Sequence, residues 1–348
     1  MWRPCGIFDD TYAKDISIVR TKFHWFCLIG VFVFLAVFPL FGGYYLVSLL
    51  TRIAIIVIVA MGLQLLSGVC GQISFGQAAF MAVGAYSTCI LINRGMSFWL
   101  AMPLAGIIAG LVGCLGGTSA LRVKGFYLAI STLAMHFVIL WLINHLKITG
   151  GTEGIYIEAP TFFGILLDTT ERKYYVIITL MVLLTVGARN LLRTRVGRVF
   201  VAIRDNDLSA QVMGINVFYY KLLAFFIACF YAGIGGSLWA LWLTLAHPEQ
   251  FSLMDNVYYF GMIIIGGMGS IPGVFLGVLF IILLEEFMMI VSPTISSLIP
   301  ALGMDIVANL SLSVFGMAII FFLIYEPRGL YRTWTVMKNS MRKYPFTY

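Results

Sequence analysis

Apolar residues run through this chain in long stretches that do not alternate with polar ones. Such runs predict spanning helices, because about 20 apolar residues in a helix cross the hydrocarbon core of a membrane, whereas a barrel strand alternates. Ten stretches have this character: Phe23–Phe41, Tyr44–Leu66, Ile73–Ile92, Phe98–Gly117, Phe126–His145, Tyr174–Ala188, Leu222–Leu245, Val257–Met268, Val274–Leu284 and Ile306–Tyr325. We therefore expect an all-α, polytopic membrane protein with about ten transmembrane or partly broken helices.

Glycine-rich segments interrupt the apolar pattern at Ser67–Gly76 and again at Gly266–Gly273. Backbone groups freed at membrane depth must be buried in protein or line a cavity, and broken helices in two halves of a transporter mark its pathway. Close helix packing at small residues is the alternative. We expect the two breaks to approach each other, and the pathway candidates are Gly71, Gln72, Ser74, Gly76, Gln77, Gly266, Gly267 and Gly269.

Two smaller features of the apolar stretches have local interpretations. Gly106, Gly110 and Gly113 share one helical stripe, which is typical of helix packing. Arg52 lies well inside the hydrocarbon if its helix starts at Tyr44, and at the interface if the helix starts at Ile53. We expect Arg52 to snorkel toward the interface.

Composition and charge placement support this interpretation and orient the chain. Hydrophobic residues make up 61% and charged residues 11%, against about 25% charged in soluble domains. Ten crossings put both termini on one side, together with most basic residues: Arg3, Lys14, Arg20, Lys22, Arg122, Lys124, Arg189, Arg193, Arg195, Arg198, Arg204, Lys221, Arg328, Arg332, Lys338, Arg342 and Lys343. The positive-inside rule makes that side cytoplasmic. Anionic lipid then explains the net charge of +7, and no nucleic-acid partner is expected.

The opposite loops collect acidic residues: Glu153, Glu158, Asp168, Glu171, Glu249, Asp255, Glu285, Glu286 and Asp305. Glu285 and Glu286 are expected to end a helix near the outer surface. The predicted organisation is a cytoplasmic extension at 1–22, one transmembrane permease domain at 23–330 with a cytoplasmic loop at 189–221, and a basic cytoplasmic tail at 331–348. The first apolar stretch lacks a cleavage site and is expected to be retained.

The loop at 189–221 is the most polar internal segment. Within it, apolar positions alternate irregularly with charges, and Gly197 and Gly214 flank a predicted short helix that Asp205 or Asn206 can cap. Such a helix suits docking in a groove of a soluble partner. We expect Ile203 to Met213 to turn apolar side chains into that groove, with Arg204, Asp205 and Asp207 at its rim. An ordinary charged loop on lipid is the alternative.

No constellation for chemistry is visible in the sequence. A GxxxxGK[ST] loop is absent, so ATP hydrolysis by this chain is not expected. The six cysteines show no CxxC spacing, and His136 and His145 are off the i, i+4 spacing of a helical metal pair. We therefore predict no catalytic residue, no metal ligand and no disulfide framework.

Six motifs, in order, carry a resemblance to a known family. They are GLQLLSGVCGQISFGQAAFMAVGAY (Gly62–Tyr86), LRVKGFYLAISTLAM (Leu121–Met135), TGGTEGI (Thr149–Ile155), GRVFVAIRDNDLSAQVMGI (Gly197–Ile215), GGMGSIPGVFLG (Gly266–Gly277) and EPRGL (Glu326–Leu330). Together they resemble the LivM-type permease of branched-chain amino-acid ABC importers. Arg52, Phe126 and the N-terminal extension depart from the family pattern and bear on the substrate.

The resemblance implies a set of partners. These are a second, LivH-type permease, two LivF/LivG-type ATPases that hold ATP and Mg, an external substrate-binding protein, and membrane lipid. It implies that this chain binds no cofactor and lies in the inner (plasma) membrane of a prokaryote. It also implies a coupling helix that contacts the ATPase, carried here by Gly197, Ala202, Ile203, Arg204, Asp205, Asn206, Asp207, Ala210 and Gly214, and an external motif at Thr149, Gly150, Gly151, Thr152 and Gly154.

Other transport functions remain open at this point. An ion-coupled secondary transporter would carry intramembrane acids, and the spans hold almost none. An ABC permease for urea or short amides would share the same motifs. A membrane enzyme would show clustered His, Asp or Cys at one depth.

Overall fold

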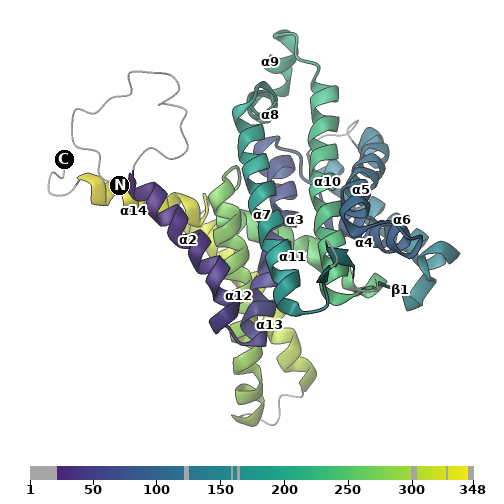
Figure 1. The fold of residues 1–348 in the computed structure, drawn as a ribbon. Coiled ribbons are helices and arrows are strands. Elements are labelled where there is room, and N and C mark those ends of the chain that lie inside the picture. Colours follow the sequence, from purple (N-terminus) through teal and green to yellow (C-terminus); the bar gives the residue numbers. More distant parts are fainter. Residues whose placement is uncertain are drawn as a thin grey trace.

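The structure is a computed structural model that describes residues 22–120, 125–157, 160–162, 165–298, 304–326 and 328–343. It is almost entirely helical, as Figure 1 shows. The predicted extension up to residue 21, together with Arg122, Lys124, Glu158 and residues 344–348, lies outside the described residues. The helical content and the apolar helices of spanning length confirm the prediction of an all-α polytopic membrane protein.

Among the described residues, six helices are long and apolar enough to cross a membrane: Tyr44–Val69, Phe98–Thr118, Phe126–His145, Thr170–Arg193, Val217–Leu243 and Ile271–Val291. A seventh span results if Leu312–Tyr325 and Leu330–Lys338, bent by 45°, are counted as one. Gln77–Asn93 is apolar but shorter.

The N-terminal half contains α2 (Lys22–Phe41), α3 (Tyr44–Leu63), a π-helical turn (Gln64–Val69), α4 (Gln77–Asn93), α5 (Phe98–Ala120), α6 (Phe126–His145) and α7 (Thr170–Arg193). The C-terminal half contains α8 (Arg195–Asp205), α9 (Asp207–Val212), α10 (Val217–Leu243), α11 (Leu253–Gly266), α12 (Ile271–Leu298), α13 (Met304–Tyr325) and α14 (Leu330–Lys343). Short 3₁₀ turns occur at Lys147–Thr149, Gly151–Glu153 and Pro248–Gln250.

Helices α3 and α10 run side by side through the middle of the molecule (Figure 1). Helices α4 and α5 pack beside α10, and α6 packs on α4 and α5, while α7, α11 and α12 contact α3. From Ala54 to Leu66, α3 and the π-helical turn are fully buried, so this segment forms the centre of the core.

Small residues allow α5 to pack closely on α10. A methyl group at Gly106 would lie 3.0 Å from the Phe230 ring, and one at Gly110 would lie 2.6 Å from the Phe226 ring. A methyl group at Gly113 would collide with Cys229. The packing interpretation of this glycine stripe is confirmed.

Helix α12 is longer than its apolar stretch predicts, because it continues through Glu285 and Glu286. The expectation that these two glutamates end a helix is wrong. Arg52, in α3, lies 3.0 Å from the Glu285 carboxylate and 3.8 Å from that of Glu286. This pairing reduces the free energy that charges cost inside an apolar helix. Arg52 thus pairs across helices, while its snorkelling toward the interface stays a prediction.

Two short antiparallel strand pairs join the loops. Strand β1 (Ile155–Tyr156) pairs with β4 (Leu245–Ala246), and β2 (Thr161–Phe162) pairs with β3 (Ile165–Leu166). The motif Thr149, Gly150, Gly151, Thr152 and Gly154 forms the turn that leads into β1. Gly150, with φ of 70°, and Gly154, with φ of 77°, occupy backbone conformations that favour glycine.

Candidate functional site

The first break begins as a π-helical turn. After Leu63 the helix widens over Gln64–Val69, and the chain is irregular from Cys70 until α4 starts at Gln77. π-helical turns are rare and concentrate at functional sites. The peptide N–H of Phe75 donates to the Thr132 hydroxyl at 2.9 Å, which ties this break to α6.

The second break lies between α11 and α12 and directly contacts the first. Nε2 of Gln64 donates to the carbonyl oxygens of Gly267 and Ser270, both at 3.0 Å. A methyl group at Gly68 would lie 2.6 Å from the peptide nitrogen of Gly269. The prediction that the breaks approach each other is therefore confirmed, whereas their role in a pathway stays a prediction.

The chain after α13 also packs on the second break. Gly329, with φ of 76°, sits so close that a methyl group there would lie 2.5 Å from Cα of Gly267. Glycine at this position allows the backbone to cross the break directly. Arg328 and Gly329 thus place the start of α14 against Gly266 and Gly267.

The polar loop forms two helices instead of one. Asn206 is extended, with φ of −161°, and separates α8 from α9. Its Oδ1 accepts hydrogen bonds from the peptide N–H groups of Leu208 and Ser209, at 3.0 and 3.1 Å, so Asn206 caps α9 as the sequence suggested. Gly214, with φ of 81°, follows the end of α9.

Gly197 does not start the helix, so that expectation is wrong. Helix α8 begins at Arg195, and Gly197 lies buried inside its first turns. A methyl group at Gly197 would lie 2.5 Å from the backbone of Leu192. The glycine therefore allows a tight corner between α7 and α8.

Arg204, near the end of α8, connects the polar loop to both breaks. Its Nη1 donates to the carbonyl oxygen of Gly68 at 3.2 Å, and its side chain covers Gly71. A methyl group at Gly269 would lie 3.2 Å from the same Nη1. Asp205 holds the other side of the guanidinium in an ion pair at 3.2 Å.

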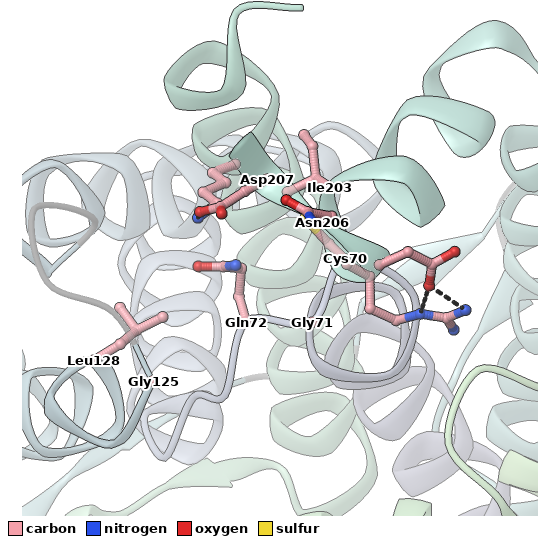
Figure 2. Close-up of a pocket in the computed structure, with 11 residues that line it drawn as sticks. Cys70, Gly71, Gln72, Gly125, Leu128, Ile203, Asn206 and Asp207 are labelled. Atoms are coloured by element: carbon pink, nitrogen blue, oxygen red, sulfur yellow. Dashed lines mark hydrogen bonds and ion pairs between the residues drawn. The ribbon is translucent and has the colours of Figure 1, made fainter. Parts of the chain in front are cut away.

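A cavity of 330 Å³ lies between α8–α9 and the first break (Figure 2). Gln72 and Leu128 face Ile203, Asn206 and Asp207 across it. Of the pathway candidates, Gly71 and Gln72 line this cavity, while Ser74, Gly76 and Gln77 do not.

Cys70 and Lys221 belong to the same cavity. The Cys70 side chain is fully buried. Lys221 pairs with the carboxylate of Asp207 at 3.4 Å, which fixes the start of α9 against α10. The cavity wall is therefore polar on the side of the loop helices.

Gln77 forms hydrogen bonds within the core and does not line the cavity. Its Nε2 donates to the carbonyl oxygens of Val59 and Ala228, which joins α3 to α10. Its neighbour Ala78 donates its peptide N–H to Asn256 at 2.8 Å, and Asn256 also pairs with His136 at 3.1 Å.

Among the described residues, no three His, Cys, Asp or Glu side chains gather in a group that could hold a metal ion.

The apolar side chains of the loop divide between the core and the surface. Ile203 is buried, so the expectation that it faces a partner is wrong. Ala210 is also buried, and Ala202 is half-buried. Leu208, Val212 and Met213 are 63%, 89% and 82% exposed. These three residues are the apolar surface that α9 and its end offer to another molecule.

Sequence reasoning missed Gln64, Thr132 and Asn256, which hold the breaks together. Each is an uncharged hydrogen-bonding side chain in a largely apolar stretch, and all three are buried. Because a buried amide or hydroxyl needs partners, an amide or hydroxyl within a stretch expected to be buried was the available signal. The pairing itself is not readable locally, since Gln64 and Ser270 lie 206 positions apart.

Apolar helices of spanning length, two apposed helix breaks and a polar helical loop fixed against both define a multi-pass membrane protein with interrupted helices. Residues 45–323 match the family described as branched-chain amino acid transport system, permease component, and the chain belongs to that family.

Individual relatives agree with the family. The high-affinity branched-chain amino acid transport system permease protein LivM of Escherichia coli K12 is 31% identical over 302 residues, covering 79% of this chain and 70% of the relative. A probable LivM of Methanocaldococcus jannaschii is 27% identical, covering 70% of this chain and 71% of the relative. The LivH permease protein of E. coli K12 is 24% identical, covering 63% and 77% respectively. No solved structure matches the chain.

Proposed function

We propose that this chain is a LivM-type permease subunit of an ATP-driven importer in a prokaryotic inner membrane, and that it translocates branched-chain or related amino acids. The substrate class comes from the names of the relatives. Family membership and the multi-pass helices support a transport role. The proposal assigns no catalytic step to this chain.

The proposed assembly contains a second, LivH-type permease, two ATPase subunits and an external binding protein. ATP and Mg bind the ATPases, and this chain holds no cofactor. The proposed topology has ten crossings, with both termini and α8–α9 in the cytoplasm, the domain at 23–330 in the membrane and the motif at Thr149–Gly154 outside. The placement of basic residues supports this orientation.

The observation that carries the proposal is the position of Arg204. It lies on the polar loop and donates to Gly68 at the first break, while its guanidinium reaches Gly269 at the second. A partner that moves α8–α9 would therefore act on both breaks at once. We propose that the exposed Leu208, Val212 and Met213 dock in a groove of an ATPase subunit.

The test is co-purification of the ATPases with this chain carrying Leu208→Asp. Losing an apolar anchor costs about 2 kcal/mol, which is roughly a 30-fold weaker association. Leu208 is exposed, so the fold should survive, and uptake into vesicles should fall with the ATPase yield.

Ser209→Asp is the matched control, since it adds the same charge at the next exposed position without removing an apolar group. It should leave ATPase binding unchanged. Normal ATPase recovery and normal amino-acid uptake with Leu208→Asp would show that α9 is only a solvated loop.

A further inference from the structure

Three charged residues meet on one side of α3 and α12. Nη2 of Arg52 lies 3.0 Å from Oε2 of Glu285, and Nη1 lies 3.8 Å from Oε1 of Glu286. The Tyr45 hydroxyl donates to Glu286. We call these residues the charged face: Tyr45, Arg52, Glu285, Glu286 and Met289, which lies one turn beyond Glu285 on α12.

The charged face lies inside the spanning helices. Arg52 is about 12 Å along α3 from Tyr44, and Glu285 is about 21 Å along α12 from Ile271, at roughly 1.5 Å per residue. Both residues fall within the apolar spans Tyr44–Val69 and Ile271–Val291. The carboxylates therefore lie within helices of spanning length and not in a loop.

The charged face is nevertheless open on the surface of this chain. The side chains of Arg52, Glu285 and Glu286 are 28%, 40% and 14% exposed, and Met289 is 68% exposed. Charged side chains at this depth avoid lipid and face protein or a water-filled cavity. A protein surface that covers the charged face would keep these side chains away from lipid.

The charge balance indicates what that molecule provides. Arg52 is the only cation that pairs with the two carboxylates in the described part of the chain. The covering surface should supply cations or hydrogen-bond donors.

A second copy of this chain does not fit that requirement. A two-fold interface brings the same patch of both subunits together, so two net-negative faces would meet in a medium of low dielectric constant, where repulsion is strong. A different subunit of the same fold can carry the complementary charges. The LivH proteins, to which this chain is also similar, are such chains.

We propose that the charged face is the surface on which the second, LivH-type permease subunit packs. This inference rests on the proposed function for the existence of that subunit. The partner contributes basic or donor side chains opposite Glu285 and Glu286, and the interface runs along the first half of α3 and the middle of α12.

The test is photo-crosslinking in the assembled transporter. A benzophenone amino acid replaces Met289 on the charged face or, as the control, Phe137, which is 53% exposed on α6. Irradiation should join the two permeases from position 289 and not from position 137. Co-purification of the unlabelled permeases tests the assembly separately, so a failure of the proposed function is distinguishable from a failure of this inference.

Three results would overturn the inference while the permeases still co-purify: an adduct from position 137 alone, an adduct from neither position, or a homodimer adduct from position 289. A second variant, Glu285→Gln, removes one of the excess carboxylates and should lower the recovery of the second permease several-fold. Glu171→Gln, at an exposed position in α7, should not. Equal recovery with both variants would argue against charge complementarity at this face.

Discussion

Arg204 donates from Nη1 to the carbonyl oxygen of Gly68 at 3.2 Å, although 136 positions separate the two residues. The bond joins the end of α8 to the point where the first long helix breaks. Because the same guanidinium lies against Gly269, a displacement of α8 changes both breaks together.

Replacing Arg204 with Gln should therefore reduce transport more than it reduces the amount of protein. The lost hydrogen bond is worth about 1 kcal/mol of folding stability, which is too little to unfold the chain. Uptake in proteoliposomes with the partner ATPases measures the effect. Arg198→Gln is the control, because Arg198 is exposed on the same helix; equal loss with both variants would show a general charge effect.

Gln64→Met should loosen the contact between the breaks. Its side chain is 1% exposed and donates to Gly267 and Ser270. Removing two hydrogen bonds within the core should lower the free energy of unfolding by about 2 kcal/mol. Thermal unfolding in detergent checks this value, with Gln211→Met on exposed α9 as the control; identical melting temperatures would contradict the expectation.

Gly329→Ala should be strongly disruptive. Its φ of 76° is unfavourable for alanine, and the added methyl group would lie 2.5 Å from Cα of Gly267. The backbone strain alone costs about 1–3 kcal/mol, before the collision is counted. Gly43→Ala should be harmless, since Gly43 has φ of −61° and open space around it. Expression and melting temperature distinguish the two, and equal behaviour would refute the close crossing.

Cys70 should react slowly with maleimide in the folded protein, because its side chain is fully buried. A variant that keeps only Cys70 allows the measurement at a fixed pH. The same chain unfolded in detergent should react at the rate of an accessible thiol, and an equally fast reaction in the folded protein would contradict burial.

The sequence predicted the class of fold and the meeting of the two breaks, because apolar length and glycine interruption are local signals. It assigned the wrong face to the polar loop for a physical reason. The prediction turned all apolar side chains from Ile203 to Met213 toward one partner, whereas the extended backbone at Asn206 separates them into two helices. Ile203 consequently turned inward, and Leu208 remained outside.

The error at Glu285 and Glu286 has a different origin. Two adjacent acidic residues predict the end of a membrane-spanning stretch, because an isolated charge is unfavourable in hydrocarbon. The helix continues because Arg52, 233 positions earlier, neutralises part of that charge. Only the three-dimensional contact shows the compensation, and no window along the chain contains both partners.

The burial of α3 has a consequence for how the protein is made. Residues 54–66 are enclosed by α4, α7, α10, α11 and α12, all of which are synthesised later. During translation this segment therefore stays in lipid or beside the insertion machinery until its packing partners have been made. The last of them, α12, begins only at Ile271. In chains truncated before α10, α3 should lack its main packing partners. We expect such chains to be degraded, even though α3 itself is apolar enough to insert.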